Sequence, residues 1–302
     1  MALVEYMVRT TSAVTSRFWH VRGMMRVAGA ANRCFRAVGG NPIVATNLNN
    51  GARLLLDMRS VGQWYSIYSR NSDSFWTKLC ADLLDDDQLF LDIGANIGIY
   101  AVQVSHLRGN VGQCHAFEPM PGNIARLTEN VALNQQQGVI SIHPYGLSDA
   151  PATLQLAFVS ADHGEDTGNA EIVDAAAAAG RETFAIEVRC LDDVALPDLP
   201  VGVIKIDVEG HEDHAYRGGT KRLTKDRPFI IAEYNREELA SRGLGPELQF
   251  APHLPPDYQA MRLQAGGGLT AIYDWSALPR LDNILLCPVE KIARLGALGL
   301  TR

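Results

Sequence analysis

The sequence predicts an α/β fold with a mainly parallel sheet that helices cover on both faces. Apolar runs of strand length occur at residues 89–93, 113–117, 139–143, 202–206 and 228–232. Segments of helix length lie between several of these runs, near 97–107, 121–134 and 210–223. Short buried strands that alternate with helices are typical of parallel sheets, because a parallel connection needs a crossover. Further runs near 257–263 and 282–287 are expected to complete the sheet as an antiparallel pair.

The composition is that of a globular protein. The chain has 302 residues, of which 47% are hydrophobic and 20% charged, and these values exclude a mainly disordered or fibrous chain. The net charge of −7 argues against a dedicated nucleic-acid-binding protein. Residues 1–40 nevertheless carry six arginines and one acid, so the excess of acids belongs to the rest of the chain.

This basic start is expected to be a helical extension over residues 1–50, with one or two helices within 3–38. A strand and a helix are expected at residues 51–84, between the extension and the main domain. The main domain is expected to occupy residues 85–302. The extension packs on the main domain or on a second copy in a homodimer, or it forms a basic surface helix that touches anionic lipid or a charged substrate. Residues 160–182, mostly small and acidic, predict a variable loop that is either a surface loop or a lid.

The cysteine pattern favours a cytoplasmic protein. Five widely spaced cysteines without a C-x-x-C pair predict reduced thiols rather than a disulfide framework or a zinc cluster. No apolar run approaches the roughly 18–20 residues of a membrane span. The N-terminus lacks the pattern of a secretory signal, although its arginine-rich composition faintly resembles an organelle transit peptide.

A glycine-rich turn follows the run at 89–93. It has the pattern D-x-G-x-N-x-G, with Asp92, Gly94, Asn96 and Gly98, and a helix is expected to follow. Ligands bind at this edge of parallel α/β sheets, and glycine allows close approach of the backbone. The turn lacks the G-x-G-x-x-G of a dinucleotide site, and an acid there would repel a pyrophosphate. The acid favours a cofactor that carries an amine, such as S-adenosylmethionine.

Two further turns fit a nucleoside. Glu118 ends the next predicted strand, where an acid accepts ribose hydroxyl protons in nucleoside-binding folds. Leu147, Ser148 and Asp149 follow the third strand, where Leu147 would cover an adenine and the two polar residues would meet its edge. An ordinary Ser-Asp turn is the alternative for this third segment.

The fourth strand ends in a cluster of ionisable residues. Asp207 stands at its tip, and Glu209 and His211 follow. His211 is a candidate general base because imidazole titrates near neutral pH, although a solvated histidine at a helix start is the alternative. Glu233 ends the fifth strand, and it would lie near Asp207 if the two strands are neighbours. A divalent cation held by Asp207 and Glu233 is possible but not favoured.

Four motifs in this order resemble the FkbM family of S-adenosylmethionine-dependent methyltransferases. They are DIGANIG at 92–98, FEP at 117–119, LSD at 147–149 and KIDVEGHE at 205–212. The resemblance implies a Rossmann-like class I methyltransferase with seven strands in the order 3-2-1-4-5-7-6. It implies O-methylation of a hydroxyl on a sugar or natural product, and a small molecule rather than nucleic acid as the acceptor.

The resemblance also assigns roles to residues. By the family pattern, the residues that bind the cofactor are Asp92, Gly94, Asn96, Gly98 and Glu118. The residues expected near the acceptor are Asp207, Glu209 and His211. Asp207 would then border both ligands, and any of the last three could be the base. The competing functions are a nicotinamide-dependent oxidoreductase and a non-catalytic nucleoside-binding protein, each on a Rossmann-like fold.

Overall fold

The computed structural model describes residues 2–39, 41–158, 170–173, 180–241, 243, 245 and 252–301. Its largest sheet has eight strands in the order β13-β12-β14-β11-β10-β3-β4-β5. They are β3 (Leu89–Ile93), β4 (Gln113–Phe117), β5 (Ile140–His143), β10 (Val201–Ile206), β11 (Phe229–Asn235), β12 (Tyr258–Leu263), β13 (Leu269–Ala271) and β14 (Leu281–Pro288). The expected count of seven is therefore wrong, because β13 adds an edge strand beside β12. Numbered among themselves along the chain, the other seven run 3-2-1-4-5-7-6.

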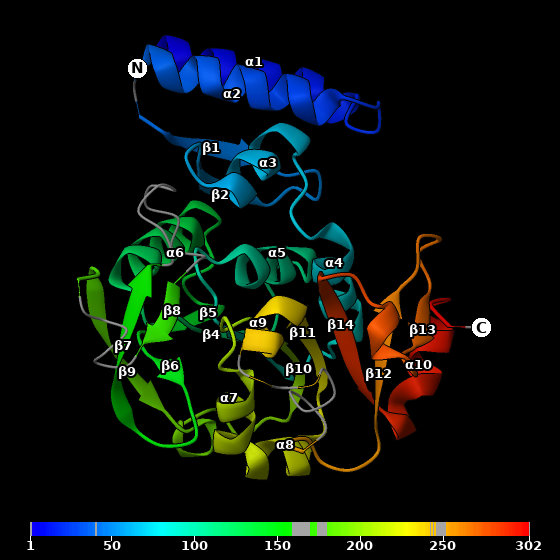
Figure 1. The fold of residues 1–302 in the computed structure, drawn as a ribbon. Coiled ribbons are helices and arrows are strands. Elements are labelled where there is room, and N and C mark those ends of the chain that lie inside the picture. The colour runs from blue at the N-terminus through cyan, green and yellow to red at the C-terminus, as the bar shows by residue number, and fades with distance from the viewer. Residues whose placement is uncertain are drawn as a thin grey trace.

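The centre of this sheet is parallel and its right-hand edge in Figure 1 is antiparallel. Strands β11, β10, β3, β4 and β5 are parallel neighbours, and β14, β12 and β13 pair antiparallel. Every residue of β3 and β10 is buried. This burial fits strands covered on both faces, and it explains why they are continuous apolar runs in the sequence.

Helices cover both faces of the sheet. The helices that follow β3 and β4 pack on one face together with α4, and those around β10 and β11 pack on the other. They are α4 (Ser74–Leu83), α5 (Ile99–Leu107), α6 (Pro121–Leu133), α7 (Glu212–Gly218), α8 (Thr220–Asp226), α9 (Arg236–Ser241) and α10 (Ile292–Ala297). The single helix expected near 210–223 is two helices, because the chain breaks at Gly219 between α7 and α8.

A second, smaller sheet stands beside the first (Figure 1). It comprises β6 (Gly146–Leu147), β7 (Ala152–Phe158), β8 (Ala170–Val173) and β9 (Thr183–Arg189), in the order β6-β9-β7-β8. Leu156, Ile186 and Val188 of this sheet pack with Met120. Of the loop expected at 160–182, residues 170–173 form β8, and most of the rest lies outside the described residues.

The N-terminal part forms a unit of its own above the main sheet in Figure 1. It comprises α1 (Ala2–Arg17), α2 (Met24–Val38), the antiparallel hairpin of β1 (Ile43–Asn47) and β2 (Arg53–Asp57), and α3 (Val61–Ser69). Of the one or two helices expected within 3–38, two are present. The boundary expected after residue 50 falls between two paired strands, and the domain division stays a prediction.

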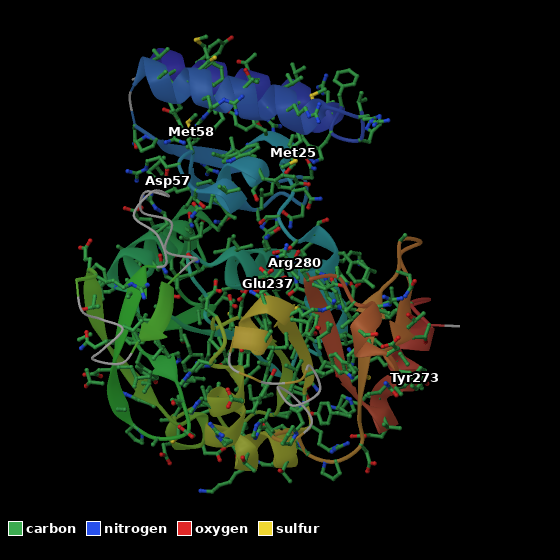
Figure 2. The ribbon with its side chains drawn as sticks, in the orientation of Figure 1. Met25, Asp57, Met58, Glu237, Tyr273 and Arg280 are labelled. Atoms are coloured by element: carbon green, nitrogen blue, oxygen red, sulfur yellow. The ribbon has the colours of Figure 1, made fainter. Side chains whose placement is uncertain are left out.

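Buried and half-buried amides join this unit to the main domain. Asn130 on α6 accepts a hydrogen bond from the Leu55 amide at 2.7 Å and donates to the Ile97 carbonyl at 2.8 Å. Asn50 donates to the side chain of Gln103 on α5 at 2.8 Å. Figure 2 shows Asp57 and Met58 between the helical pair and the main domain. The edge of β2 therefore meets side-chain amides of α6 instead of a further strand.

The outer face of α1 and α2 is partly apolar. Tyr6, Val14, Val27 and Val38 are exposed there. A homodimer through this face stays a prediction. Among the described residues, no helix combines the length and apolarity needed to cross a bilayer. All five cysteines are described and unpaired, and three of them are buried.

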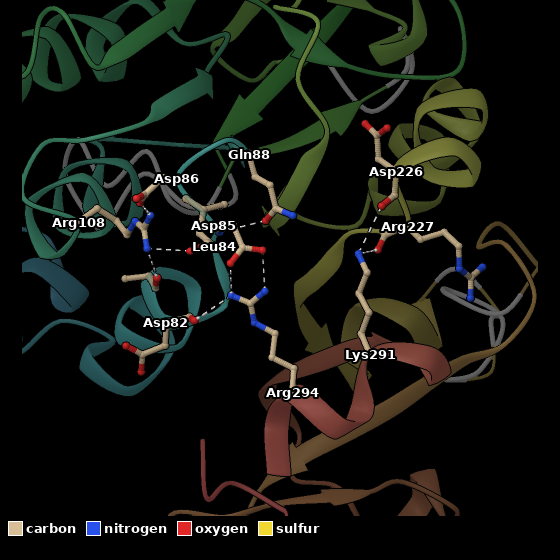
Figure 3. Close-up of polar contacts among 11 residues, drawn as sticks. Asp82, Leu84, Asp85, Asp86, Gln88, Arg108, Asp226, Arg227, Lys291 and Arg294 are labelled. Carbon is tan, nitrogen blue, oxygen red and sulfur yellow. Dashed lines mark hydrogen bonds and ion pairs between the residues drawn. The ribbon is translucent and has the colours of Figure 1, made fainter. Parts of the chain in front are cut away.

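The C-terminal helix is tied to the main domain by polar contacts (Figure 3). Arg294 on α10 bonds both carboxylate oxygens of Asp85, and it also donates to the carbonyl of Asp82 at the end of α4. Lys291 donates to the carbonyl of Arg227. These bonds hold α10 against the end of α4 and the turn after α8.

Candidate active site

The turn between β3 and α5 has a backbone that its glycines make possible. Gly94, Asn96 and Gly98 all have positive φ angles, of 79°, 51° and 87°. A Cβ on Gly94 would lie 1.8 Å from the carbonyl oxygen of Asp207, and one on Gly98 would lie 2.4 Å from Leu127. Gly94 therefore lets the tips of β3 and β10 approach each other, whereas Gly98 lets α6 pack on the turn.

Asp92 is buried at the end of β3, with 2% of its surface exposed. Its Oδ2 accepts a hydrogen bond from the amide of Ala101 at 2.8 Å. Burial raises the pKa of this carboxyl to about 7, against the lowering effects of the Ala101 amide and of Lys205. Asp92 is therefore an acid whose charge is costly until a cation approaches it.

Glu118 is also buried, with 4% exposed, and it organises the turn. Its carboxylate accepts hydrogen bonds from the Asn96 amide at 2.8 Å, the Met120 amide at 2.9 Å and the Asn123 side chain at 3.1 Å. Burial raises the pKa of Glu118, and these three donors oppose that effect. A carboxylate has about four acceptor positions, so roughly one is left for a further donor.

The fourth strand brings its acids to the same edge. Asp207 follows β10, and its Oδ2 lies 3.4 Å from the Nζ of Lys205. Glu209 has a φ of 50° in the turn before α7. His211 begins α7, and its Nε2 lies 2.9 Å from the hydroxyl of Ser148. The sequence-predicted cluster therefore forms, but His211 and Asp207 each already have a polar partner.

Ser148 and Asp149 are held by α7. Asp149 pairs with His214 at 3.1 Å and with Arg217 at 3.2 Å, while Ser148 meets His211. The rings of His211 and His214 stack with centroids 4.2 Å apart. These contacts direct both polar side chains of the turn toward α7.

These elements enclose a pocket at the strand ends, which we call the strand-tip pocket. Of the predicted site residues, its lining includes Asp92, Gly94, Asn96, Glu118, Leu147, Asp207, Glu209 and His211. Gly98, Ser148, Asp149 and Glu233 lie outside the lining. The empty space bordered by these residues, with the open solvent at its mouth included, is about 1090 Å³.

The charge of this pocket is negative. Among its described lining residues are five carboxylates and one amine, namely Asp73, Asp92, Glu118, Asp207, Glu209 and Lys205. The pocket also contains one buried polar atom without a hydrogen-bond partner among the described residues, the side-chain oxygen of Asn96. Buried polar atoms are rarely left unpaired, so this oxygen indicates a polar ligand. The hydroxyl of Tyr100 acts on the carboxylate of Asp73 and lowers its pKa.

Lys205, Tyr100 and Asp73 line the pocket but were not among the site residues that the sequence predicts. Lys205 is 2% exposed, donates to Asn283 at 3.1 Å and lies 5.1 Å from the centre of the Tyr100 ring. Burial alone would lower the pKa of Lys205, but Asp207 and Glu233 outweigh it and raise that pKa. The signal in the sequence was a single lysine inside an apolar strand.

The position of Lys205 argues against a divalent cation held by Asp207 and Glu233. Its ammonium lies beside Asp207 and is electrostatically coupled to Glu233, the two carboxylates considered for a divalent cation. Within the described part of the chain, no group of three or more His, Cys, Asp or Glu side chains has the arrangement of a metal site. A fixed positive charge thus already stands where the cation would go.

Comparison with known proteins adds a family. Residues 92–262 match the family model described as the methyltransferase FkbM domain. The chain is similar to hexuronic acid methyltransferase AglP of Haloferax volcanii, with 26% identity over 195 residues that cover 64% of this chain and 74% of that protein. It is also similar to methyltransferase sdnD of Sordaria araneosa, with 27% identity over 170 residues that cover 47% of this chain and 65% of that protein. Among solved structures, methyltransferase FkbM from Methylobacillus flagellatus matches with 16% identity and a TM-score of 0.45, over 74% of this chain and 52% of that one.

Proposed function

This chain belongs to the methyltransferase FkbM domain family, and from that premise we propose that it transfers a methyl group from S-adenosylmethionine to a hydroxyl of a sugar or natural product. The observation that carries the proposal is the acid-lined strand-tip pocket with its buried Asp92. S-adenosylmethionine is cationic at its sulfonium and its amine, and an acidic pocket suits it better than it suits an anionic nicotinamide dinucleotide.

The residues of the pocket fit this cofactor in chemistry. Asp92 would gain a cation that stabilises its charge, and Glu118 has about one acceptor position left for a ribose hydroxyl. The unpaired Asn96 oxygen would accept a hydrogen bond from the amine or from a ribose hydroxyl. Leu147 lines the pocket with an apolar surface for the adenine.

The acceptor side of the reaction needs alignment and removal of a proton. The acceptor oxygen forms the new C–O bond as the C–S bond breaks, and the bonding electron pair stays on sulfur to leave S-adenosylhomocysteine. The hydroxyl proton passes to a base, for which Asp207, Glu209 and His211 are the candidates. We propose His211 first, with Ser148 as the hydroxyl that orients its ring.

One relative supports a carbohydrate acceptor. It is named as a hexuronic acid methyltransferase, and a carbohydrate acceptor is therefore proposed for this chain. The negative pocket favours an uncharged acceptor over a free acid.

Calorimetry with S-adenosylhomocysteine and turnover of radiolabelled S-adenosylmethionine with methyl glycosides test the proposal. Binding with transfer to oxygen supports it, whereas binding without transfer favours a non-catalytic nucleoside-binding protein. Binding of a nicotinamide dinucleotide instead would contradict it. A His211→Ala variant that binds cofactor normally and keeps full turnover would remove His211 as the base.

A further inference from the structure

A second cavity lies between α3, the start of α4 and the glycine-rich turn, and we call it the α3–α4 cavity. We propose that it binds the methyl acceptor, and that this acceptor is an uncharged polyhydroxylated molecule such as a neutral glycoside. The inference rests on the proposed function, because it names the second substrate of that same reaction. Most of the lining lies at residues 60–76, outside the stretch that matches the family model.

The α3–α4 cavity adjoins the strand-tip pocket. Asp73, Asn96 and Ile99 line both. The empty space of the α3–α4 cavity, with the open solvent at its mouth included, is about 1470 Å³. These shared residues place an acceptor in the α3–α4 cavity next to the pocket proposed for the cofactor.

The lining of the α3–α4 cavity suits hydroxyl groups. It contains uncharged hydrogen-bonding side chains, among them Ser66, Asn71, Ser72 and Ser74, and the rings of Tyr65 and Phe75. Hydroxyls and amides both donate and accept, as sugar hydroxyls require, and aromatic rings offer flat apolar surface to the C–H face of a sugar. Asp73 is the one charged side chain among the described residues of this lining.

Asp73 is placed at the junction by an unusual backbone. It precedes α4 with φ 48° and ψ 36°, and its side chain does not cap the helix. The amide of Ser74 instead meets the side-chain oxygen of Asn71 at 3.3 Å. Aspartate before a helix normally accepts a hydrogen bond from the second or third amide of the helix. The Asp73 carboxylate makes no such bond and is left to other donors, of which the Tyr100 hydroxyl is one. Left-handed backbone outside glycine is costly and often marks a functional position.

The charges around Asp73 discriminate between acceptors. The side chain of Asp73 is solvent-exposed, but the protein around it still raises its pKa by desolvation. Lys205 and the Tyr100 hydroxyl oppose that rise, and Asp207 adds to it. Because Lys205 is already bonded to Asp207 and Asn283, little positive charge is left for a substrate carboxylate. A uronate would place a third negative charge at the junction, whereas a neutral hydroxyl would donate to Asp73.

Two variants and two matched controls test the site. Gly62 lines the α3–α4 cavity, and nothing lies within 4 Å of its Cβ position, so Gly62→Trp adds a large ring to the lining from an uncrowded position. Gly138→Trp adds the same ring at an equally open position away from both cavities. Asp73→Asn removes the charge at the junction, and Asp82→Asn removes one at the far end of α4, where it pairs with Lys78.

The probes are S-adenosylhomocysteine, methyl β-D-glucopyranoside and methyl β-D-glucopyranosiduronate. Gly62→Trp and both controls should bind S-adenosylhomocysteine within about twofold of the wild type. Asp73→Asn should bind it more weakly, because Asp73 also lines the strand-tip pocket. Gly62→Trp should raise the KM for the glucoside about tenfold or more. Asp73→Asn should lower kcat/KM for the glucoside by about 10- to 100-fold, the range for a lost hydrogen bond to a charged group, and lower it less for the glucuronide. Both controls should behave as wild type.

Unchanged glucoside kinetics in Gly62→Trp and Asp73→Asn would overturn the site while leaving the proposed function in place. A wild type that prefers the glucuronide, or that binds S-adenosylhomocysteine and methylates neither probe, would overturn the acceptor class. A wild type that does not bind S-adenosylhomocysteine would overturn the proposed function itself.

Discussion

The strand-tip pocket and the α3–α4 cavity share three residues but are held together in different ways. The pocket depends on backbone: Gly94 lets two strand tips touch, and the amides of Asn96 and Met120 bind Glu118. The α3–α4 cavity depends on side chains that join segments far apart in the sequence. An example is the Gln103 side chain, which donates a hydrogen bond to the backbone carbonyl of Ser72. Short local motifs therefore determine the first site, and long-range packing determines the second.

The largest expected effect comes from the backbone of the strand-tip pocket. Gly94→Ala should abolish measurable binding of S-adenosylhomocysteine and lower the free energy of unfolding by about 2–5 kcal/mol, from left-handed strain plus overpacking. The clash is with a main-chain atom, the carbonyl oxygen of Asp207 1.8 Å from the new Cβ, so the strand tips must separate. Urea unfolding and calorimetry measure the two quantities.

Gly109→Ala is the matched control for this prediction. Gly109 also has a positive φ, of 68°, but no atom lies within 4 Å of its Cβ position. The free energy of unfolding of Gly109→Ala should fall by only the cost of left-handed strain, about 1–2 kcal/mol, and the variant should bind S-adenosylhomocysteine normally. Equal losses in the two variants would show that the approach of β3 and β10 is unimportant for the pocket.

The next effect should fall on the α3–α4 cavity rather than on the strand-tip pocket. Gln103 is 1% exposed, and its amide donates to the carbonyls of Ser72 and Ile99. Gln103→Leu leaves the Ser72 carbonyl unpaired beside Asp73 and also removes the acceptor of Asn50. We therefore expect a loss of about 1–3 kcal/mol of stability and a higher acceptor KM. The affinity for S-adenosylhomocysteine should stay the same.

Gln136→Leu makes the same change at a site remote from both cavities. Gln136 is fully buried and bonds the carbonyl of Val102 on the same helix α5 and the side chain of Asn110. We expect a similar loss of stability with unchanged acceptor kinetics. If Gln136→Leu raised the KM as much as Gln103→Leu, general destabilisation would explain the effect.

This contrast also explains what could be predicted from the sequence. The turn at Asp92 and the cluster after β10 are local patterns that follow strands, so their position at one sheet edge follows from the parallel topology. Asp73 carries no such pattern: it meets the pocket because α4 packs beside α5 and because Asn71 takes over the helix cap. Lys205 is held in part by Asn283, which is 78 residues further along the chain.

The same reasoning applies to the fold. Strands of the parallel centre are continuous apolar runs because both faces are buried, and they were predicted to within a few residues. The hairpin of β1 and β2 was only half predicted, since its second strand has an apolar run and its first is short and mixed. The contacts of Ser148 and Asp149 with α7 depend on His214 and Arg217, whose positions no local motif determines.

A smaller effect should appear in the pH dependence of the strand-tip pocket. Burial raises the pKa of Asp92 to about 7, so its carboxyl is half protonated near neutral pH in the free protein. Its folded pKa exceeds the unfolded value, so its contribution to stability is present at low pH and is lost as the pH rises through about 7. A bound ammonium group favours the ionised form of Asp92. The affinity for the ligand should therefore increase as the pH rises toward 7, whereas this contribution to stability decreases.

We therefore expect S-adenosylhomocysteine to bind about fivefold more weakly at pH 6 than at pH 7, and to release a fraction of a proton on binding. Calorimetry in two buffers of different ionisation enthalpy measures that proton. Between pH 6 and 7 the ligand's own amine stays protonated, so its titration does not contribute to the change. Asp92→Asn should remove the dependence, and a variant that kept it would assign the proton to another group.

The smallest effect should come from the contact that ties α10 to the end of α4. Asp85 and Arg294 are partly exposed, so Asp85→Asn should lower the free energy of unfolding by no more than about 1 kcal/mol. The Arg294 hydrogen bond lowers the pKa of Asp85, so the contact should persist until the pH falls below the ordinary range of a carboxyl. Cofactor affinity and acceptor KM should both be unchanged. Because Arg294 also holds the carbonyl of Asp82, this variant asks whether the far end of α4 influences Asp73 at its start. A raised acceptor KM would show that the whole helix positions the α3–α4 cavity, and that its packing network extends as far as the C-terminal helix.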